Sequence, residues 1–204
     1  MTGLLSADRL RLYRGDRCLI RDLSFALNPG ELLLVEGANG SGKTSLLRAI
    51  AGLLPLDQGE IHWRGKATRL HRQELSAEMS WLAHRLGMKY DLTLVENLRF
   101  EARLRGAKWH DQESLLRRLG IDRLTRLPLR ALSAGQQRRV ALARLILSAS
   151  GLWLMDEPFT NLDVAGHDLV LELVREHLRD GGLCVVASHQ SFDIGAPTRR
   201  VTLQ

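Results

Sequence analysis

The stretch Gly37–Ala38–Asn39–Gly40–Ser41–Gly42–Lys43–Thr44 matches the phosphate-binding pattern G-x-x-x-x-G-K-[ST]. An apolar run at residues 32–35 precedes it and predicts a buried strand, and residues 44–51 predict a helix that ends near Gly52. A strand, a glycine-rich turn and a helix in this order form the setting in which the pattern marks a site. The stretch therefore predicts that the chain binds a nucleoside triphosphate.

The residue types in this loop suit a triphosphate group. Gly37, Gly40 and Gly42 let the backbone bring N–H groups close to phosphate oxygens, and the helix N-terminus adds partial positive charge. Lys43 supplies a mobile charge for the β- and γ-phosphates, and Thr44 supplies a hydroxyl ligand for Mg²⁺. We expect the site to include the other polar residues of this segment, namely Asn39, Ser41 and Ser45.

The size and composition of the chain predict one α/β domain with a substantial core, since it has 204 residues, 45% hydrophobic and 25% charged. The net charge of +6 indicates an acidic partner such as nucleic acid, anionic lipid or a phosphorylated ligand. Because the basic residues are spread along the chain, no specific nucleic-acid surface is predicted.

The sequence predicts neither a secretory signal nor a membrane-spanning segment. The first six residues lack a charged segment followed by an apolar one, and no apolar run approaches the roughly 20 residues that cross a bilayer. Cys18 and Cys184 have no metal-ligand spacing and are interpreted as reduced thiols of a cytosolic protein. Any membrane association is therefore expected to come through another protein.

Two further regions surround the nucleotide-binding segment. Residues 4–36 and 60–64 contain short alternating segments separated by turns, at 8–13, 18–20 and 23–27, and they predict an antiparallel layer. Residues 71–131 are charged and have helical periodicity, with helices expected at 93–104 and 111–119. No linker composition bounds this stretch, so it is interpreted as a helical insertion and not as a second domain.

A second phosphate-binding position is predicted at the start of a later helix. Ser133 and Gln136 fit the capping-box pattern S-x-x-Q, and Gly135 lies between them. A helix N-terminus with an exposed serine and glycine can bind phosphate, although capping of the helix alone also explains the pattern.

Acidic and histidine side chains follow two apolar strands. Asp156 and Glu157 end the strand predicted at residues 152–155, where an aspartate can hold Mg²⁺ and a glutamate can orient or deprotonate an attacking water. His189 follows the strand predicted at 183–187, and ligands of α/β sheets bind at the carboxyl ends of strands. These residues are candidates for catalysis beside the phosphate-binding loop.

In their identity and order, these elements resemble the ATP-binding-cassette (ABC) ATPases over essentially the whole chain. The matching segments are residues 37–44, Leu132–Ser133–Ala134–Gly135–Gln136, Asp156–Glu157, Asn161–Leu162–Asp163 and His189. The resemblance implies an α/β P-loop NTPase fold of ABC type, with a mixed core sheet flanked by helices, an antiparallel β layer and the helical insertion. Residues 1–204 would form a single ATP-binding domain.

The resemblance also implies an ATPase that acts as a head-to-tail homodimer. Each ATP would lie between residues 37–44 of one copy and the Ser133 helix terminus of the other, with Gly135 and Gln136 at that terminus and Asp163 coupling the two sites. Hydrolysis would remove the phosphate that bridges the two copies, so that they separate.

Within each site the resemblance assigns a role to each side chain. Thr44 and Asp156 would hold Mg²⁺, Glu157 would be the catalytic base, and His189 would contact the γ-phosphate together with Lys43. Tyr13 fits either a packed strand aromatic or a platform for a purine ring. The family places an adenine-stacking aromatic at that position, which favours the second interpretation.

Several shorter matches resemble the branch of the family that serves haem export in cytochrome c maturation. They are Ala83–His84, Gly87, Lys89, Leu92–Thr93, Glu96–Asn97–Leu98, Phe100, Ala134, Glu157–Pro158–Phe159–Thr160 and Ser188–His189–Gln190. This resemblance implies a peripheral subunit on the cytoplasmic face of a bacterial inner membrane, with integral-membrane transporter subunits as partners. Its ATPase activity would release a haem-loaded chaperone.

One departure and two alternatives accompany this interpretation. Alignment of residues 81–85 places Arg85 where the family has a glutamine that contacts Mg²⁺ and the membrane partner, and an arginine accepts no metal bond. The alternatives are the ATPase subunit of another small ABC exporter and an ABC ATPase that acts on nucleic acid or ribosomes. A basic chain keeps the latter open, but no second cassette, coiled coil or dedicated binding insertion is found in the sequence.

Overall fold

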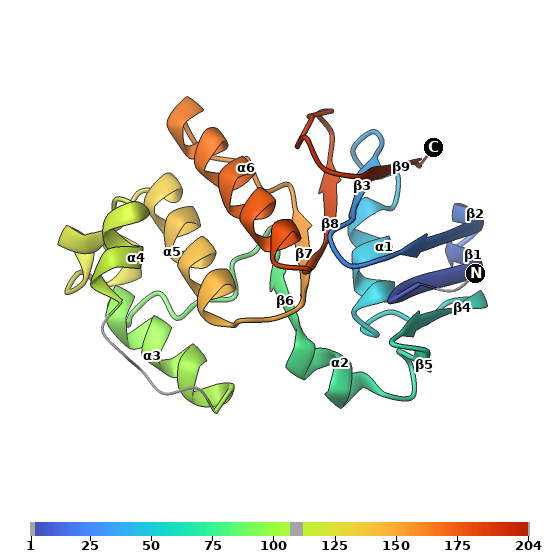
Figure 1. The fold of residues 1–204 in the computed structure, drawn as a ribbon, viewed down its shortest axis with the longest axis horizontal. Helices are drawn as coiled ribbons and strands as arrows, with labels where there is room; N and C mark the ends of the chain where they lie inside the picture. The colour runs from blue at the N-terminus through green and yellow to red at the C-terminus, as the bar shows by residue number, and fades with distance from the viewer. Residues whose placement is uncertain (1–2, 107–111, 204) are drawn as a thin grey trace.

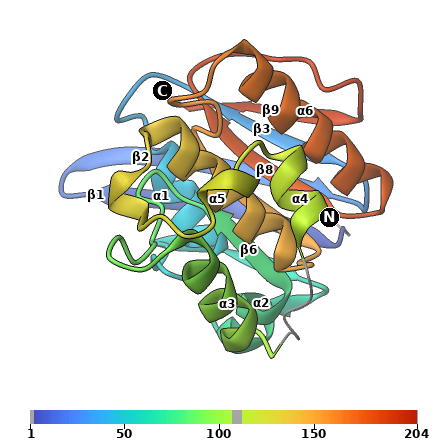
Figure 2. The ribbon, with the colours of Figure 1, turned by 90° about the vertical axis from the view of Figure 1, so that its left-hand side faces the viewer.

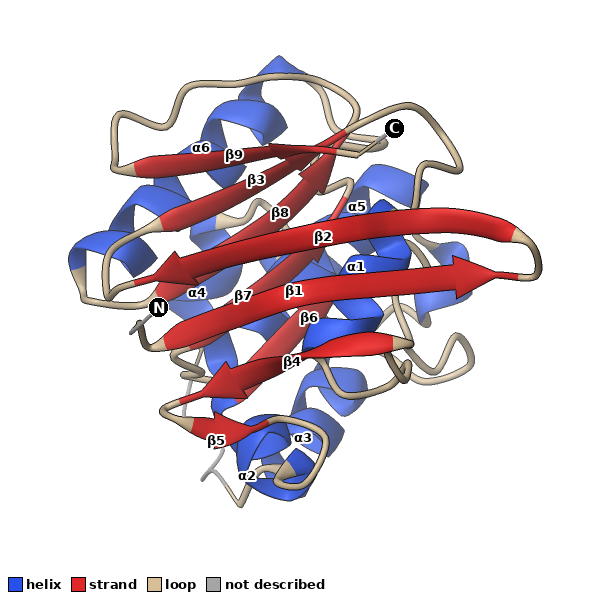
Figure 3. Ribbon diagram, turned by 90° about the vertical axis from the view of Figure 1, so that its right-hand side faces the viewer, coloured by secondary structure: helices blue, strands red, loops and turns tan. Residues whose placement is uncertain are grey.

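The computed structural model describes residues 3–106 and 112–203, and it places two β-sheets on one side of a group of helices (Figure 1). No helix in these described ranges combines the length and the apolar character needed to cross a membrane. The two sheets enclose one helix between them, and the two long helices at residues 134–147 and 164–179 cover the far face of the parallel sheet (Figure 3).

The first sheet is the expected antiparallel layer. It consists of β1 (Leu5–Arg14), β2 (Arg17–Leu27), β4 (Gln58–Trp63) and β5 (Lys66–Ala67), in the order β2-β1-β4-β5. The segments expected separately at 18–20 and 23–27 form one continuous strand. The break in their alternation is a register shift between β1 and β2, where Asp22 has a φ of 52°.

The second sheet forms the core and contains β3 (Leu32–Glu36), β6 (Met79–Leu82), β7 (Leu152–Asp156), β8 (Leu183–Ser188) and β9 (Thr198–Thr202). Its order is β6-β7-β8-β3-β9, and all four pairings in the described chain are parallel. The expected mixed core sheet is thus corrected to a parallel one. The three central strands are covered on both faces, which explains their continuous apolar sequences.

The two faces of the core sheet pack against different helices. Leu33 and Val35 of β3 face α1 (Lys43–Ile50) and the antiparallel sheet, whereas Leu32 and Leu34 face the opposite core. That second core contains α5 (Ala134–Leu147) and α6 (Val164–Arg179). Alternate residues of one strand therefore join the two layers and fix the loop at residues 37–42 between β3 and α1.

Part of the stretch expected as a helical insertion belongs to the core. Residues 71–131 begin with α2 (Arg72–Glu78) and β6, and β6 is an edge strand of the parallel sheet. The helices α3 (Leu94–Leu104) and α4 (Glu113–Arg118) follow and lie beside α5 (Figure 2). The helix expected at 93–104 is capped by Thr93, and the expected start of the next helix at residue 111 lies outside the described residues. Short 3₁₀ turns at Asp122–Leu124 and Leu129–Ala131 lead into α5.

Candidate functional site

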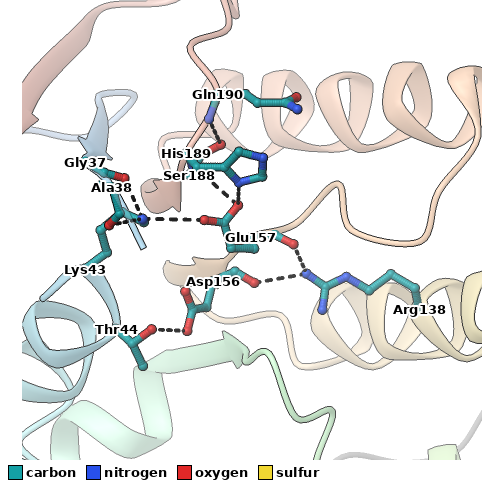
Figure 4. Close-up of polar contacts among 10 residues, drawn as sticks. All are labelled: Gly37, Ala38, Lys43, Thr44, Arg138, Asp156, Glu157, Ser188, His189 and Gln190. Atoms are coloured by element: carbon teal, nitrogen blue, oxygen red, sulfur yellow. Dashed lines mark hydrogen bonds and ion pairs between the residues drawn. The ribbon is translucent and has the colours of Figure 1, made fainter. Parts of the chain in front are cut away.

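The candidate residues of the core sheet converge at the carboxyl ends of β3, β7 and β8 (Figure 4). The loop after β3 leads into α1, β7 ends at Asp156, and His189 directly follows β8. Because the three strands are parallel neighbours, residues separated by more than 100 positions in the chain meet at one edge of the sheet.

The loop after β3 folds tightly around its own lysine. The ammonium group of Lys43 donates hydrogen bonds to the carbonyl oxygens of Gly37 (2.7 Å) and Ala38 (3.1 Å). Gly37 has a φ of 151°, and a Cβ there would stand 2.5 Å from both Ser41 Oγ and the Leu203 carbonyl oxygen. Glycine is therefore required at the start of the loop. In the described structure the buried Ser41 hydroxyl has no hydrogen-bond partner, as is suitable for a group that faces a bound phosphate.

Thr44 and Asp156 join the helix α1 to the end of β7. The Thr44 hydroxyl donates a 2.8 Å hydrogen bond to Asp156 Oδ2, and Asp156 is only 2% exposed. Burial raises the pKa of Asp156 above its ordinary value, and the bond from Thr44 opposes that shift. A hydroxyl and a buried carboxylate within hydrogen-bond reach are hard oxygen ligands, so the pair fits Mg²⁺.

Glu157 directly follows β7 in a strained backbone conformation. Its φ is 49°, and its backbone N–H donates to the carbonyl oxygen of Ala187 at 2.8 Å. One carboxylate oxygen lies 3.7 Å from Lys43 Nζ, and the other lies 2.7 Å from Nδ1 of His189. The carboxylate is therefore held between two side chains that can contact a terminal phosphate (Figure 4).

A cavity of about 720 Å³ opens over this edge of the sheet. The predicted residues that line it are Asn39, Gly40, Gly42, Lys43, Thr44, Ser45, Asp156 and Glu157. Arg14, Arg17, Arg48 and His84 line it as well, and none of the four was predicted from the sequence to be a site residue. The lining thus carries more cationic than anionic side chains, which suits a polyanion such as a nucleoside triphosphate.

Arg85, which the sequence places where the family has a glutamine, lies next to a residue of the cavity lining. His84 lines the cavity, and both His84 and Arg85 line a neighbouring groove of about 580 Å³. Pairing of β6 with β7 sets which residue after Leu82 reaches the cavity, and that pairing joins segments about 70 positions apart.

Tyr13 lies at the end of β1 beside the cavity. Its neighbour Arg14 is among the lining residues, and Tyr13 itself is not. The Tyr13 backbone N–H donates to the carboxylate of Asp57 at 2.7 Å, which fixes this end of the strand. The side chain is 43% exposed and is not packed into the core. An exposed ring beside the cavity is compatible with stacking on a base.

The capping box predicted before α5 is confirmed. Ser133 Oγ accepts from the N–H of Gln136 at 3.2 Å, and the Gln136 side chain accepts from the N–H of Ser133 at 2.9 Å. Gly135 packs so closely that a Cβ there would stand 2.7 Å from the carbonyl oxygen of Asn161. The cavity lining contains none of the three signature residues. One copy of the chain therefore does not bring them to its own phosphate-binding loop.

Asp163 caps the next helix. Its Oδ1 accepts from the N–H of Gly166 at 2.9 Å and lies 3.2 Å from a guanidinium nitrogen of Arg139. The Gly166 hydrogen bond, followed by the charge of Arg139, lowers the pKa of Asp163. The helix α6 consequently begins at Val164, directly after its capping residue. Asp163 is not part of the cavity lining.

The comparisons with known proteins agree with this arrangement of segments. The family model described as "ABC transporter" matches residues 20–160. The chain belongs to the ABC transporter family and is an ABC-type ATPase that binds ATP.

Two curated relatives match nearly the whole chain. The cytochrome c biogenesis ATP-binding export protein CcmA of Methylococcus capsulatus is 45% identical over 201 residues, which cover 98% of this chain and 97% of the relative. The protein of Cupriavidus metallidurans with the same description, CcmA 2, is 45% identical over 191 residues, which cover 92% and 90%. These matches confirm the resemblance inferred from the sequence motifs.

Solved structures of other ABC proteins share the fold at lower identity. An ABC transporter ATP-binding protein from Pyrococcus furiosus has a TM-score of 0.84 at 23% identity, with 96% of each chain covered. A dimeric ATP-binding cassette in a post-hydrolysis state, bound to ADP and Pi, has a TM-score of 0.79 at 22% identity and covers 91% of this chain and 88% of its own. The P-loop α/β core and the antiparallel layer are therefore the fold of this family.

Proposed function

We propose that the chain is the ATP-hydrolysing subunit of a bacterial ABC membrane complex that serves haem export, or release of a haem-loaded chaperone, in c-type cytochrome biogenesis. The proposal is supported by 45% identity over 98% of the chain to a cytochrome c biogenesis export protein. The observation that carries the catalytic part is the position of the Glu157 carboxylate between Lys43 and His189.

ATP binding is assigned to the loop and the cavity above it. The triphosphate would lie against the backbone N–H groups of residues 37–44, with Lys43 at the β- and γ-phosphates and Tyr13 stacked on the adenine. Thr44 and Asp156 are the residues that would hold Mg²⁺, and the ion when bound neutralises charge on the phosphate oxygens. The cationic lining residues Arg14, Arg17 and Arg48 add attraction for the anion.

Hydrolysis is assigned to Glu157 and His189. Water would attack the γ-phosphorus as the bond to the bridging oxygen of ADP breaks, and Glu157 would accept the proton of the attacking water. His189, hydrogen-bonded to Glu157 at 2.7 Å, would orient that carboxylate and contact the γ-phosphate. ADP and inorganic phosphate are the products.

A head-to-tail homodimer would complete each site. The N-terminus of α5, with Ser133, Gly135 and Gln136, lies away from the cavity of its own copy and would donate to the γ-phosphate bound by the other copy. Asp163, which caps α6 and pairs with Arg139 of α5, would couple the two sites. This dimer is supported by the capped, exposed terminus of α5.

The membrane partner would dock where the core meets the helices. The groove of about 580 Å³ is lined by residues that follow β6 and by α5, and it lies next to the ATP cavity through the shared residue His84. An integral-membrane transporter subunit bound here would hold the ATPase as a peripheral protein on the cytoplasmic face of the inner membrane. No specific nucleic-acid partner is proposed.

The test uses Glu157→Gln, expressed at modest level in the host. The amide cannot accept the proton, so ATP binding should persist while hydrolysis is lost and the dimer is stabilised. Membranes are solubilised, the proteins that co-purify with the variant are identified, and the same cells are stained for covalently bound haem. Integral-membrane partners together with lost c-type cytochromes would support the full proposal.

Other outcomes would reject defined parts of it. Membrane partners with normal cytochromes would leave an exporter ATPase with another cargo. Ribosomes or DNA in place of membrane proteins would overturn the transport assignment. Hydrolysis by Glu157→Gln at the wild-type rate would reject Glu157 as the base.

A further inference from the structure

Arg138 lies in the second turn of α5 and points toward the end of β7 (Figure 4). Its guanidinium donates to the backbone carbonyl oxygens of Asp156 (3.0 Å), Glu157 (2.5 Å) and Pro158 (3.2 Å). A fourth hydrogen bond, of 3.2 Å, reaches the carbonyl oxygen of Ala83 after β6. One side chain therefore contacts three consecutive residues around the catalytic carboxylates and the segment that leads to the cavity.

The guanidinium of Arg138 is buried, so its charge has to be satisfied by hydrogen bonds to these carbonyl oxygens. Arg138 is only 3% exposed, and desolvation lowers its pKa to about 10, against the opposing charges of Asp156 and Glu157. Burial of a charge destabilises a fold unless hydrogen bonds satisfy it, and an apolar side chain of similar volume would fill the same space without that penalty. The four carbonyl contacts thus explain how the guanidinium is tolerated in the core.

The contacts fall where the backbone is strained. Glu157 has a left-handed φ of 49°, which a non-glycine residue maintains only when its surroundings hold it. Its N–H is bonded to Ala187 in β8, and its carbonyl oxygen is bonded to Arg138. The two bonds fix the peptide groups on both sides of the Glu157 Cα atom and hence the direction of its side chain.

We propose that Arg138 is a positioning residue for ATP hydrolysis, which holds the backbone of residues 156–158 so that the Glu157 carboxylate stays between Lys43 and His189. This inference rests on the proposed role of Glu157 as catalytic base. Arg138 also ties this segment, and Ala83 beside the cavity residue His84, to α5. A displacement of α5 is therefore transmitted to two parts of the ATP site in the same copy.

The experiment compares Arg138→Gln and Arg138→Lys with wild type in the full chain. ATP affinity is measured with a fluorescent ATP analogue, and kcat and KM are measured by phosphate release. Arg138→Gln removes the guanidinium and its set of hydrogen bonds. We therefore expect kcat to fall about 100-fold, with KM and ATP affinity within about twofold of wild type. Arg138→Lys keeps the positive charge but not the planar guanidinium with its several donors. We expect its kcat to be about tenfold higher than that of Arg138→Gln and about tenfold lower than that of wild type.

Arg144 provides a matched control on the same helix. It is largely buried and donates to the carbonyl oxygen of Gly87 at 3.2 Å, and within the described residues its polar partners are Gly87 and Glu101 and not residues 156–158. Arg144→Gln should lose stability to a similar degree while kcat stays within about twofold of wild type. The difference in kcat between the two glutamine variants separates positioning of Glu157 from general loss of packing.

The outcomes distinguish this inference from the proposed function. A folded Arg138→Gln variant with wild-type kcat, or an equal fall in kcat for Arg144→Gln, would overturn the role of Arg138. If Arg138→Gln does not fold, Arg138→Lys decides, since a kcat within twofold of wild type rejects the role. If Glu157→Gln hydrolyses ATP like wild type, the assigned base itself is wrong, whatever the Arg138 variants do.

Discussion

Replacement of Thr44 by valine removes one hydroxyl and leaves the shape of the side chain nearly unchanged. That hydroxyl donates 2.8 Å to Asp156, which is 2% exposed. A hydrogen bond to a charged group contributes about 1.5–3 kcal/mol, and loss of the donor leaves a buried carboxylate without this partner. We therefore expect Thr44→Val to lower the free energy of unfolding by about 2 kcal/mol. Thr44→Ser keeps the hydroxyl and should lose less than about 1 kcal/mol.

The magnitude is accessible to ordinary unfolding assays. With a urea m-value of about 2 kcal/mol/M, a loss of about 2 kcal/mol moves the unfolding midpoint by about 1 M. For a chain of this length the same loss lowers Tm by about 4–8 °C. Both are measured without nucleotide or Mg²⁺, with Thr44→Ser as the control. A Thr44→Val midpoint equal to that of Thr44→Ser would refute the argument that this hydrogen bond stabilises the fold.

The pH dependence of the deficit gives an independent check. Burial raises the folded-state pKa of Asp156 above its ordinary value, and loss of the Thr44 hydrogen bond should raise it further. The folded variant then binds a proton over a wider pH range, so its stability falls more than that of wild type as pH rises through that range. The deficit should be full above the folded pKa of the variant and should shrink at pH 4. If the stability difference between wild type and Thr44→Val becomes larger as pH falls, this prediction is wrong.

Two other substitutions test the phosphate loop and a buried histidine. Lys43→Ala should weaken ATP binding by at least about tenfold, because it removes the charge at the β- and γ-phosphates; unchanged affinity for a fluorescent ATP analogue would oppose this assignment. His177 stacks on Trp153 at 4.0 Å, and burial lowers its pKa below 6.5. Wild type should therefore lose stability as pH falls from 6.5, by at most about 1.4 kcal/mol per pH unit, and His177→Phe should lack this component. If urea unfolding shows the same pH dependence of stability for wild type and His177→Phe, this role of His177 is rejected.

The sequence predicted the parts of the site that are encoded within a few residues. The loop from Gly37 to Thr44, the capping box of Ser133 and Gln136 and the acidic end of β7 all rest on local hydrogen bonds, glycine conformations or short apolar runs. Such features form from neighbouring residues, so their spacing in the chain is sufficient to recognise them. The order of these segments along the chain then indicated the ABC family, and the family model matches residues 20–160.

The tertiary structure decided which distant segments meet. The place of β6 at the edge of the parallel core sheet, and with it the position of His84 at the cavity, depends on pairing between strands about 70 residues apart. In the sequence Arg138 is one of several charged residues of α5, and only the packing of this helix against the end of β7 brings it to the backbone of Asp156. The physical reason is that side-chain periodicity specifies an element and its buried face, whereas the partner of that face is set by long-range packing.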